Sequence, residues 1–255
     1  MEEKWTINEI KDYLVNKEPS NEVLQYLEKD TRMGVKKLLQ QYQNSIVAKK
    51  AEEEKFIEMS RFEQQLWQKN IISIVGVDEV GRGPLAGPVV VAAVVLPKDF
   101  KLLGLDDSKK VPKKRELFFR YITTHAVEYS IGIVEAAEID QINILQASKK
   151  AMYIAIEKLS SVDYVLIDAV HLEQLRVPSM AIIKGDQKSI SIAAASIVAK
   201  VTRDQIMADI HNDYPQYGFN KNSGYGTKQH LEAIQQNGLT SYHRRSFLKS
   251  YIDRE

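Results

Sequence analysis

The spacing of apolar residues changes near residue 70. Before that point, apolar side chains recur at steps of three and four, the period of an amphipathic helix. They include Leu24, Leu27, Val35, Leu38, Leu39 and Tyr42. Residues 1–70 contain a single glycine and a single proline, and Thr6 and Ser20 stand where helix N-caps are expected. The pattern predicts a small helical extension over residues 1–70.

From residue 71 onward, β-branched runs are bounded by glycine and proline. Two such runs, 71–80 and 88–97, are expected strands, and three further strands are expected at 126–136, 163–169 and 179–185. Helical patterns fill 139–159 and 189–214, and the small residues of the second would let a helix pack closely on a sheet. Strands that alternate with helices in the second half of the chain predict a mixed α/β sheet.

Composition narrows the possible classes of protein. The 255 residues are 44% hydrophobic and 27% charged, and none is a cysteine. Disulfides and thiolate zinc sites are therefore excluded, and a cytoplasmic location is expected. The longest apolar run, 89–96, is much shorter than the roughly 20 residues that span a bilayer, and the acidic, amphipathic first residues are unlike a secretory signal. The net charge of +1 does not indicate a nucleic-acid partner.

Acidic residues stand at or just after the ends of three expected strands. They are Asp78, Asp168 and Asp186, and Glu79 adds a fourth. If these strands are neighbours in one sheet, their ends converge where open α/β sheets bind ligands. Four crowded carboxylates would repel one another, and a divalent cation with oxygen ligands, Mg²⁺ or Mn²⁺, would relieve the repulsion. A single aspartate at a strand end is more often a turn residue or a helix cap, but the adjacent pair is harder to explain in that way.

Glycines follow the acid pair closely. Successive residues of a strand point to opposite faces, so Asp78 and Glu79 can share a site only if the strand bends there. We expect Gly81 and Gly83 to permit that bend. The dinucleotide-binding fingerprint does not fit, because Pro84 interrupts it and a strand follows where a helix is required. The sequence has no phosphate-binding P-loop, no paired-histidine zinc motif and no nucleophile elbow, although a Ser-His-Asp triad stays possible.

Seven segments, taken in order, resemble the motifs of bacterial ribonuclease HII, the type 2 ribonuclease H. They are VDEVGRGPLAGPVV, DDSKK, INILQASKKAM, VLIDA, KGDQKSISIAAASIVAKVTRD, SGYGT and HRRSF. The resemblance covers about residues 71–250, and Val80 and Arg82 favour this family over ribonuclease HIII. It implies a ribonuclease H-like fold, in which a mixed five-stranded sheet is flanked by helices. The catalytic domain would then be 71–255, after the helical extension 1–70, which would be either an added substrate-binding unit or a structural brace on the catalytic domain.

The resemblance also implies an activity and a site. The activity is hydrolysis of the RNA strand of RNA/DNA hybrids, and cutting 5′ to ribonucleotides embedded in duplex DNA, as in ribonucleotide excision repair. Two Mg²⁺ or Mn²⁺ ions would assist a monomeric enzyme that has no membrane partner. The acids that would be both catalytic and metal-binding are Asp78, Glu79, Asp168 and Asp186. The residues that would bind substrate are Gly81, Arg82, Gly83 and Tyr225, with Ser108, Lys109 and Asn143 as further candidates.

Basic residues around Pro112, where a helix is expected to begin, could bind phosphates. They are Lys109, Lys110, Lys113, Lys114 and Arg115, and some of them would simply be a solvated face. Two other functions stay open. A resolvase or transposase relative would share the acids but would have no use for the glycines and Tyr225. A non-catalytic nucleic-acid-binding module would not need four acids, which repel phosphate.

Overall fold

A computed structural model describes residues 5–105 and 112–252, and the chain forms two compact units, Met1–Lys55 and Phe56–Glu255. The first unit contains α1 (Ile7–Asn16), α2 (Asn21–Glu28) and most of α3 (Met33–Met59). Thr6 and Ser20 are N-caps, as predicted, since their side chains accept the amides of the residues three positions later. The core of this unit consists of Ile10, Leu14, Leu27, Val35 and Leu39.

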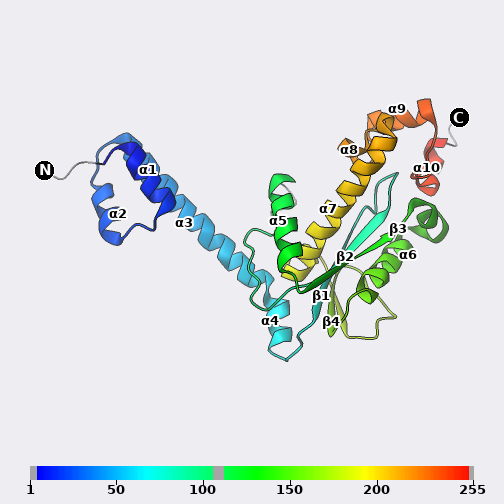
Figure 1. Cartoon of the computed structure of the whole chain (residues 1–255), viewed down its shortest axis with the longest axis horizontal. Helices are drawn as coiled ribbons and strands as arrows, with labels where there is room; N and C mark the ends of the chain where they lie inside the picture. The colour runs from blue at the N-terminus through cyan, green and yellow to red at the C-terminus, as the bar shows by residue number, and fades with distance from the viewer. Residues whose placement is uncertain (1–4, 106–111, 253–255) are drawn as a thin grey trace. The chain divides into compact units, whose positions relative to one another are not determined.

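The second unit is built on one five-stranded sheet of order β3-β2-β1-β4-β5 (Figure 1). The strands are β1 (Ile74–Val80), β2 (Val89–Val95), β3 (Glu128–Val134), β4 (Tyr164–Asp168) and β5 (Ser179–Ile182). β2 pairs antiparallel with β1 and β3, whereas β1, β4 and β5 are parallel. This mixed sheet confirms the predicted fold class. Because β1, β4 and β5 are parallel, their carboxyl ends lie at the same edge.

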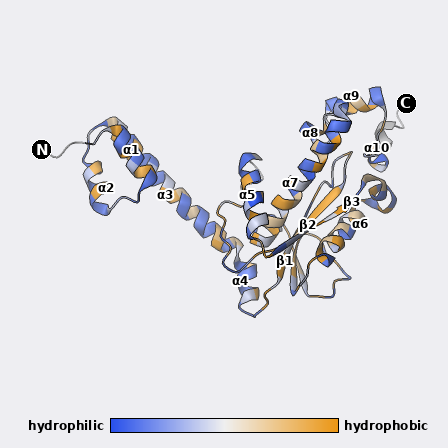
Figure 2. Ribbon diagram, in the orientation of Figure 1, coloured by the Kyte–Doolittle hydropathy of each residue, from blue (hydrophilic) through white to orange (hydrophobic). Residues whose placement is uncertain are grey.

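Helices cover both faces of the sheet. The helices of this unit after α3 are α4 (Arg61–Trp67), α5 (Pro112–His125), α6 (Ala136–Glu157), α7 (Ile190–Asp213), α8 (Phe219–Asn222), α9 (Lys228–Asn237) and α10 (Arg245–Ile252), with short turns η1 (Gly185–Gln187) and η2 (Pro215–Tyr217). One face packs on α6 and the other on α7, so every residue of β2 is buried and the strand is orange in Figure 2. The approach of α7 is so close that a Cβ on Gly76 would collide with the backbone of Ser191. The small residues of α7 explain this fit.

Residues 56–67 belong to the sheet unit. Leu66 of α4 packs with Ile74 and Leu166 of the sheet. Glu63, also on α4, is fully buried, and one of its carboxylate oxygens accepts hydrogen bonds from Ser189 Oγ at 2.5 Å and from the Ser191 amide at 3.0 Å. Burial raises the pKa of Glu63. The sheet unit thus begins well before the change in sequence texture at residue 70. No helix in the described part of the chain is long and apolar enough to cross a membrane.

Candidate active site

Three strand ends bring acidic residues to one edge of the sheet. Val77 of β1 and Ile167 of β4 are register partners, and Asp78 and Asp168 are the next residues of the two strands. Beyond β5, the chain turns into η1, which carries Asp186. The amide of Gly185 donates a 2.7 Å hydrogen bond to Asp168 Oδ1, which ties this turn to β4. The predicted convergence of the strand ends is confirmed.

The predicted bend between Asp78 and Glu79 is wrong. β1 continues through both residues, and its ladder with β2 is regular to the pair of Val80 with Val90. The chain bends only at Gly81, whose φ is +93°. The expectation failed because β2 extends the ladder past the acids. The two carboxylates therefore start from opposite faces of β1, and they can serve one site only around the end of the strand, where the chain turns at Gly81.

The electrostatic environment of Glu79 shows that the acids act on one another. Its Oε1 accepts a 3.1 Å hydrogen bond from Arg82 Nη1, whereas Oε2 is buried without a hydrogen-bond partner. Burial raises the pKa of Glu79; Arg82 opposes this rise, and the negative charge of Asp168 adds to it. Asp78 is only 4% exposed, and its Oδ1 accepts the amide of Glu79 at 2.8 Å.

The chemistry of these side chains fits a hard divalent ion. Within residues 5–105 and 112–252, no three acidic or histidine side chains are already arranged to hold a metal ion. However, Glu79 has a buried carboxylate oxygen without a partner, and the negative charge of Asp168 adds to the rise of its pKa. Both features are expected of crowded acids in the absence of a cation. Oxygen ligands suit Mg²⁺ and Mn²⁺. Oε2 of Glu79 could bind such an ion while Oε1 keeps its hydrogen bond to Arg82.

Residues 81–88, which we call the glycine loop, are folded around two buried arginines. Arg203 of α7 donates from Nε to the Pro88 carbonyl at 3.0 Å and from Nη2 to the Ala86 carbonyl at 3.1 Å. Arg244 donates to three further carbonyls of the loop: those of Gly81, Arg82 and Gly87. Both arginines are completely buried. The carbonyl dipoles of the loop thus take the place of carboxylate partners.

The structure explains why position 81 is a glycine. Its positive φ disfavours other residues, and a Cβ there would collide with Nε of Arg203. Sequence reasoning missed both arginines, although Arg203 and Arg244 lie inside two of the motifs that were recognised. The signal was an arginine within the apolar, small-residue pattern of α7. Burial lowers the pKa of both side chains; for Arg244 the pKa falls to about 9, and the positive charge of Arg203 contributes to this fall.

Tyr225 lies against the glycine loop. A Cβ added to Gly83 would stand 3.6 Å from Cε1 of the Tyr225 ring. The preceding residue, Gly224, accepts the amide of Leu85 at 2.8 Å, so the two segments are joined through their backbones. The ring is 49% exposed. The loop and the tyrosine that the sequence indicated therefore form one open surface, which Arg82 connects to Glu79.

Comparison with known proteins decides the family. The family model described as Ribonuclease HII matches residues 75–250. The chain belongs to the ribonuclease HII family. The model described as Ribonuclease HII N-terminal domain matches residues 6–67. A relative named Ribonuclease HII, from Bacillus mycoides (strain KBAB4), is 52% identical over 251 residues, which are 96% of this chain and 96% of the relative.

Solved structures agree with the family. The ribonuclease H2 of Pyrococcus horikoshii OT3 has a TM-score of 0.61 and 25% identity, and the match covers 71% of this chain and 98% of that chain. Bst-RNase HIII, solved in complex with Mn²⁺, has a TM-score of 0.55 at 15% identity, and the match covers 72% of this chain and 71% of that chain. The second likeness shows a shared fold. Membership of the ribonuclease HII family supports the activity of a ribonuclease H, a hydrolase that acts as an endoribonuclease.

Three other residues of this ribonuclease HII-family chain were predicted to bind substrate: Ser108, Lys109 and Asn143. Ser108 and Lys109 lie outside the described residues. Asn143 is exposed and interrupts α6 with a φ of +66°. Its Oδ1 accepts the amides of Leu145 and Gln146, so it caps the second part of the helix. This local role explains the asparagine without a ligand. Arg115 of the basic cluster lies 3.6 Å from an oxygen of Asp204.

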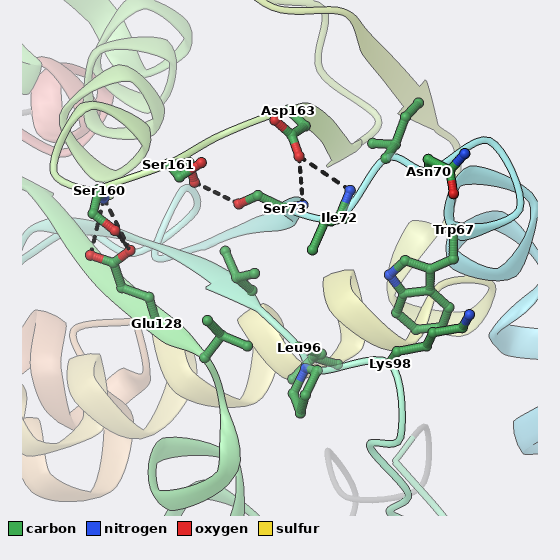
Figure 3. Close-up of a pocket in the computed structure, with 14 residues that line it drawn as sticks. Trp67, Asn70, Ile72, Ser73, Leu96, Lys98, Glu128, Ser160, Ser161 and Asp163 are labelled. Carbon is green, nitrogen blue, oxygen red and sulfur yellow. Dashed lines mark hydrogen bonds between the residues drawn. The ribbon is translucent and has the colours of Figure 1, made fainter.

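A cavity of about 650 Å³ lies at the other end of the strands (Figure 3). It is bordered by the start of β1, the end of β2 and the residues before β4. Its carboxylates are engaged: Asp163 accepts the amides of Ile72 and Ser73, and Glu128 accepts the amide and hydroxyl of Ser160. The cavity is thus distinct from the acid edge.

Proposed function

We propose that this chain hydrolyses the RNA strand of RNA/DNA hybrids and cuts 5′ to ribonucleotides embedded in duplex DNA. The observation that supports this is the continuity of the acids with the glycine loop. Arg82 belongs to the loop and pairs with Glu79 at 3.1 Å, while Gly83 lies beside Tyr225. A strand that contacts the loop and the tyrosine would therefore have a phosphate close to the acids.

The catalytic and metal-binding residues of the proposal are Asp78, Glu79, Asp168 and Asp186. Two bound Mg²⁺ or Mn²⁺ ions would supply an activated water and would stabilise the leaving 3′ oxygen. The residues of the chain prepare for this in their present arrangement. Gly185 orients Asp168 through its amide, and Arg82 orients Glu79 through Oε1, which leaves Oε2 for the metal. The other donors of the exposed Arg82 guanidinium can bind a phosphate of the substrate.

The glycine loop and Tyr225 would distinguish RNA from DNA. The 2′-hydroxyl is the group that a protein can use for that distinction at any sequence. Gly83 is exposed and has no side chain, so the backbone of the loop can approach a sugar closely. Arg203 and Arg244 fix the carbonyls of the loop before substrate arrives, which lowers the entropic cost of binding. The exposed ring of Tyr225 offers a stacking surface.

The first unit would add affinity for the nucleic acid. Lys29, Lys36 and Lys37 are exposed on it. Arg32 contributes less, because it forms a 2.6 Å ion pair with Asp30. Contacts between exposed lysines and phosphates release counterions, so such binding weakens as salt rises. We infer that residues 1–55 strengthen substrate binding and leave the chemical step unchanged.

The test compares three substrates: a duplex with one embedded ribonucleotide, a long RNA/DNA hybrid and an all-DNA duplex. The wild type should cut the first two, leaving a 3′-hydroxyl and a 5′-phosphate. Tyr225→Ala should lose stacking worth about 1–3 kcal/mol, with the larger loss on the single ribonucleotide, which has fewer other contacts. Tyr129→Ala is the matched control, because Tyr129 is similarly exposed, at 42%, on the edge strand β3. Cutting of all-DNA duplex would favour a resolvase-like nuclease, and equal losses on both ribonucleotide substrates would refute the role of Tyr225.

A further inference from the structure

Two buried histidines lie directly behind Tyr225. His230 on α9 and His243 in the segment before α10 are 0% and 2% exposed. Their Nε2 atoms are 3.1 Å apart. On one side, His230 Nδ1 is 2.9 Å from the carbonyl oxygen of Tyr225. On the other side, the amide of Thr240 donates to His243 Nδ1 at 2.9 Å. The four groups form one continuous chain of hydrogen bonds.

The groups at the two ends of this series of hydrogen bonds determine which nitrogen of each histidine ring carries the proton. An amide can only donate, so His243 Nδ1 is an acceptor and the proton of His243 is on Nε2. A carbonyl can only accept, so His230 carries its proton on Nδ1. His243 Nε2–H then donates to His230 Nε2, and both rings are neutral. Burial lowers the pKa of both histidines, and the neighbouring ring of His230 helps to lower that of His243 to about 4.

The chain of hydrogen bonds joins two segments that border the glycine loop. Ala86 of the loop forms an isolated antiparallel bridge with His243. On the other side of the loop, the carbonyl of Gly224 accepts the amide of Leu85. The histidines therefore connect the two strands of backbone that flank residues 85–87, and they do so at Tyr225 itself.

We propose that His230 and His243 are positioning residues, which hold the backbone of Tyr225 against the glycine loop and thereby set the selectivity for a ribonucleotide next to DNA. The inference rests on the proposed function, in which Tyr225 contacts that junction. A plainer role is packing, since the rings meet Tyr217 and Phe219 edge-on. Packing alone would affect all substrates equally, whereas the loss of a hydrogen bond to Tyr225 would act only through that residue.

The test is a double-mutant cycle with His230→Leu and Tyr225→Ala, measured as kcat/KM on the single-ribonucleotide duplex and on the long hybrid. His230→Leu should lower kcat/KM on the single ribonucleotide on the order of ten-fold more than on the hybrid. In the Tyr225→Ala background it should cause no further selective loss, because the group that it positions is gone. His211→Leu is the control, since His211 is a partly buried histidine of α7 whose Nδ1 has no hydrogen-bond partner.

Conservative variants keep the proposal testable if His230→Leu does not fold. His230→Asn retains a donor at the position of Nδ1 and should keep selectivity within about two-fold of the wild type, whereas His230→Gln places its amide at the position of Nε2 and should lose it. Equal selectivity of the two variants would overturn the proposal, as would a His230→Leu defect that persists in the Tyr225→Ala background. If Tyr225→Ala lowers kcat/KM equally on both substrates, the proposed role of Tyr225 fails and this inference fails with it. If Tyr225→Ala causes a larger loss on the single ribonucleotide but His230→Leu causes equal losses on both substrates, the role of Tyr225 stands and only this inference is refuted.

Discussion

Two truncations that differ by fifteen residues should behave very differently. Deleting residues 1–55 removes one compact unit and leaves the other intact. Deleting residues 1–70 also removes α4 and the end of α3, which pack into the sheet unit. Met59 and Leu66, which are 3% and 9% exposed there, would be lost. Glu63, the acceptor for Ser189 and Ser191 at the start of α7, would be lost with them.

The size of the effect follows from these contacts. Removing a large buried apolar side chain costs about 2–5 kcal/mol, so Met59 and Leu66 together account for roughly 4–10 kcal/mol. Leaving the Ser189 hydroxyl and the Ser191 amide without their acceptor costs about 1–3 kcal/mol more for each group that stays buried. A domain of this kind is stable by only about 5–15 kcal/mol. The longer deletion should therefore abolish most or all of the stability of the sheet unit.

Thermal unfolding followed by circular dichroism and steady-state cleavage at several salt concentrations test both deletions. The chain lacking residues 1–55 should unfold cooperatively and keep kcat nearly unchanged. Its KM should rise and its salt dependence should be flatter, because phosphate contacts have been removed. The chain lacking residues 1–70 should show no cooperative transition. Melting temperatures within a few degrees of each other would refute the role of α4, and an unchanged KM for the shorter deletion would refute substrate binding by the first unit.

Three further outcomes test the acidic residues. Asp78→Asn should abolish cleavage, because it removes a metal ligand. It should leave substrate binding, measured by fluorescence anisotropy, largely intact, because it lessens the repulsion toward phosphate. Asp140→Asn is the control, and residual activity of Asp78→Asn above a few per cent would argue against Asp78 as an essential ligand. Millimolar Mg²⁺ should raise the melting temperature of the wild type more than that of Asp78→Asn, and equal shifts would count against binding at the cluster. For Glu63 and Glu79, burial raises both pKa values above 4.5. The folded metal-free protein therefore binds more protons than the unfolded chain between 4.5 and the raised values, and its stability should fall as pH rises through that window. Glu63→Gln should reduce this fall in urea unfolding measured across pH, and an unchanged slope would contradict the assignment.

The sheet could be predicted from sequence because its information is local. Each strand is a short run of mainly apolar residues, and all five strands formed within the expected ranges. The common edge of the carboxyl ends of β1, β4 and β5 followed from a general property of parallel strands. The N-caps at Thr6 and Ser20 were equally local, since each depends on residues three positions away.

Features that depend on distant contacts could not be predicted. Whether β1 bends after Asp78 depends on how far its ladder with β2 extends, and strand periodicity alone does not give that length. Arg203 contacts Pro88 across 115 positions, and Arg244 contacts Gly81 across 163. Arginine is almost never fully buried, so the residue type alone pointed away from the burial of these two residues. Glu63 is similar, because its acceptor role requires residues 126 and 128 positions later.

The two buried arginines also determine how late during synthesis the glycine loop can complete its hydrogen bonds. Residues 81–88 leave the ribosome long before Arg203, and Arg244 is made later still. A nascent chain that has reached residue 190 already contains every acid of the edge and all five strands. The loop carbonyls, however, still lack the guanidinium groups that bind them. The acids of the edge can thus gather before the glycine loop takes its final form, which requires that the last motif has been translated.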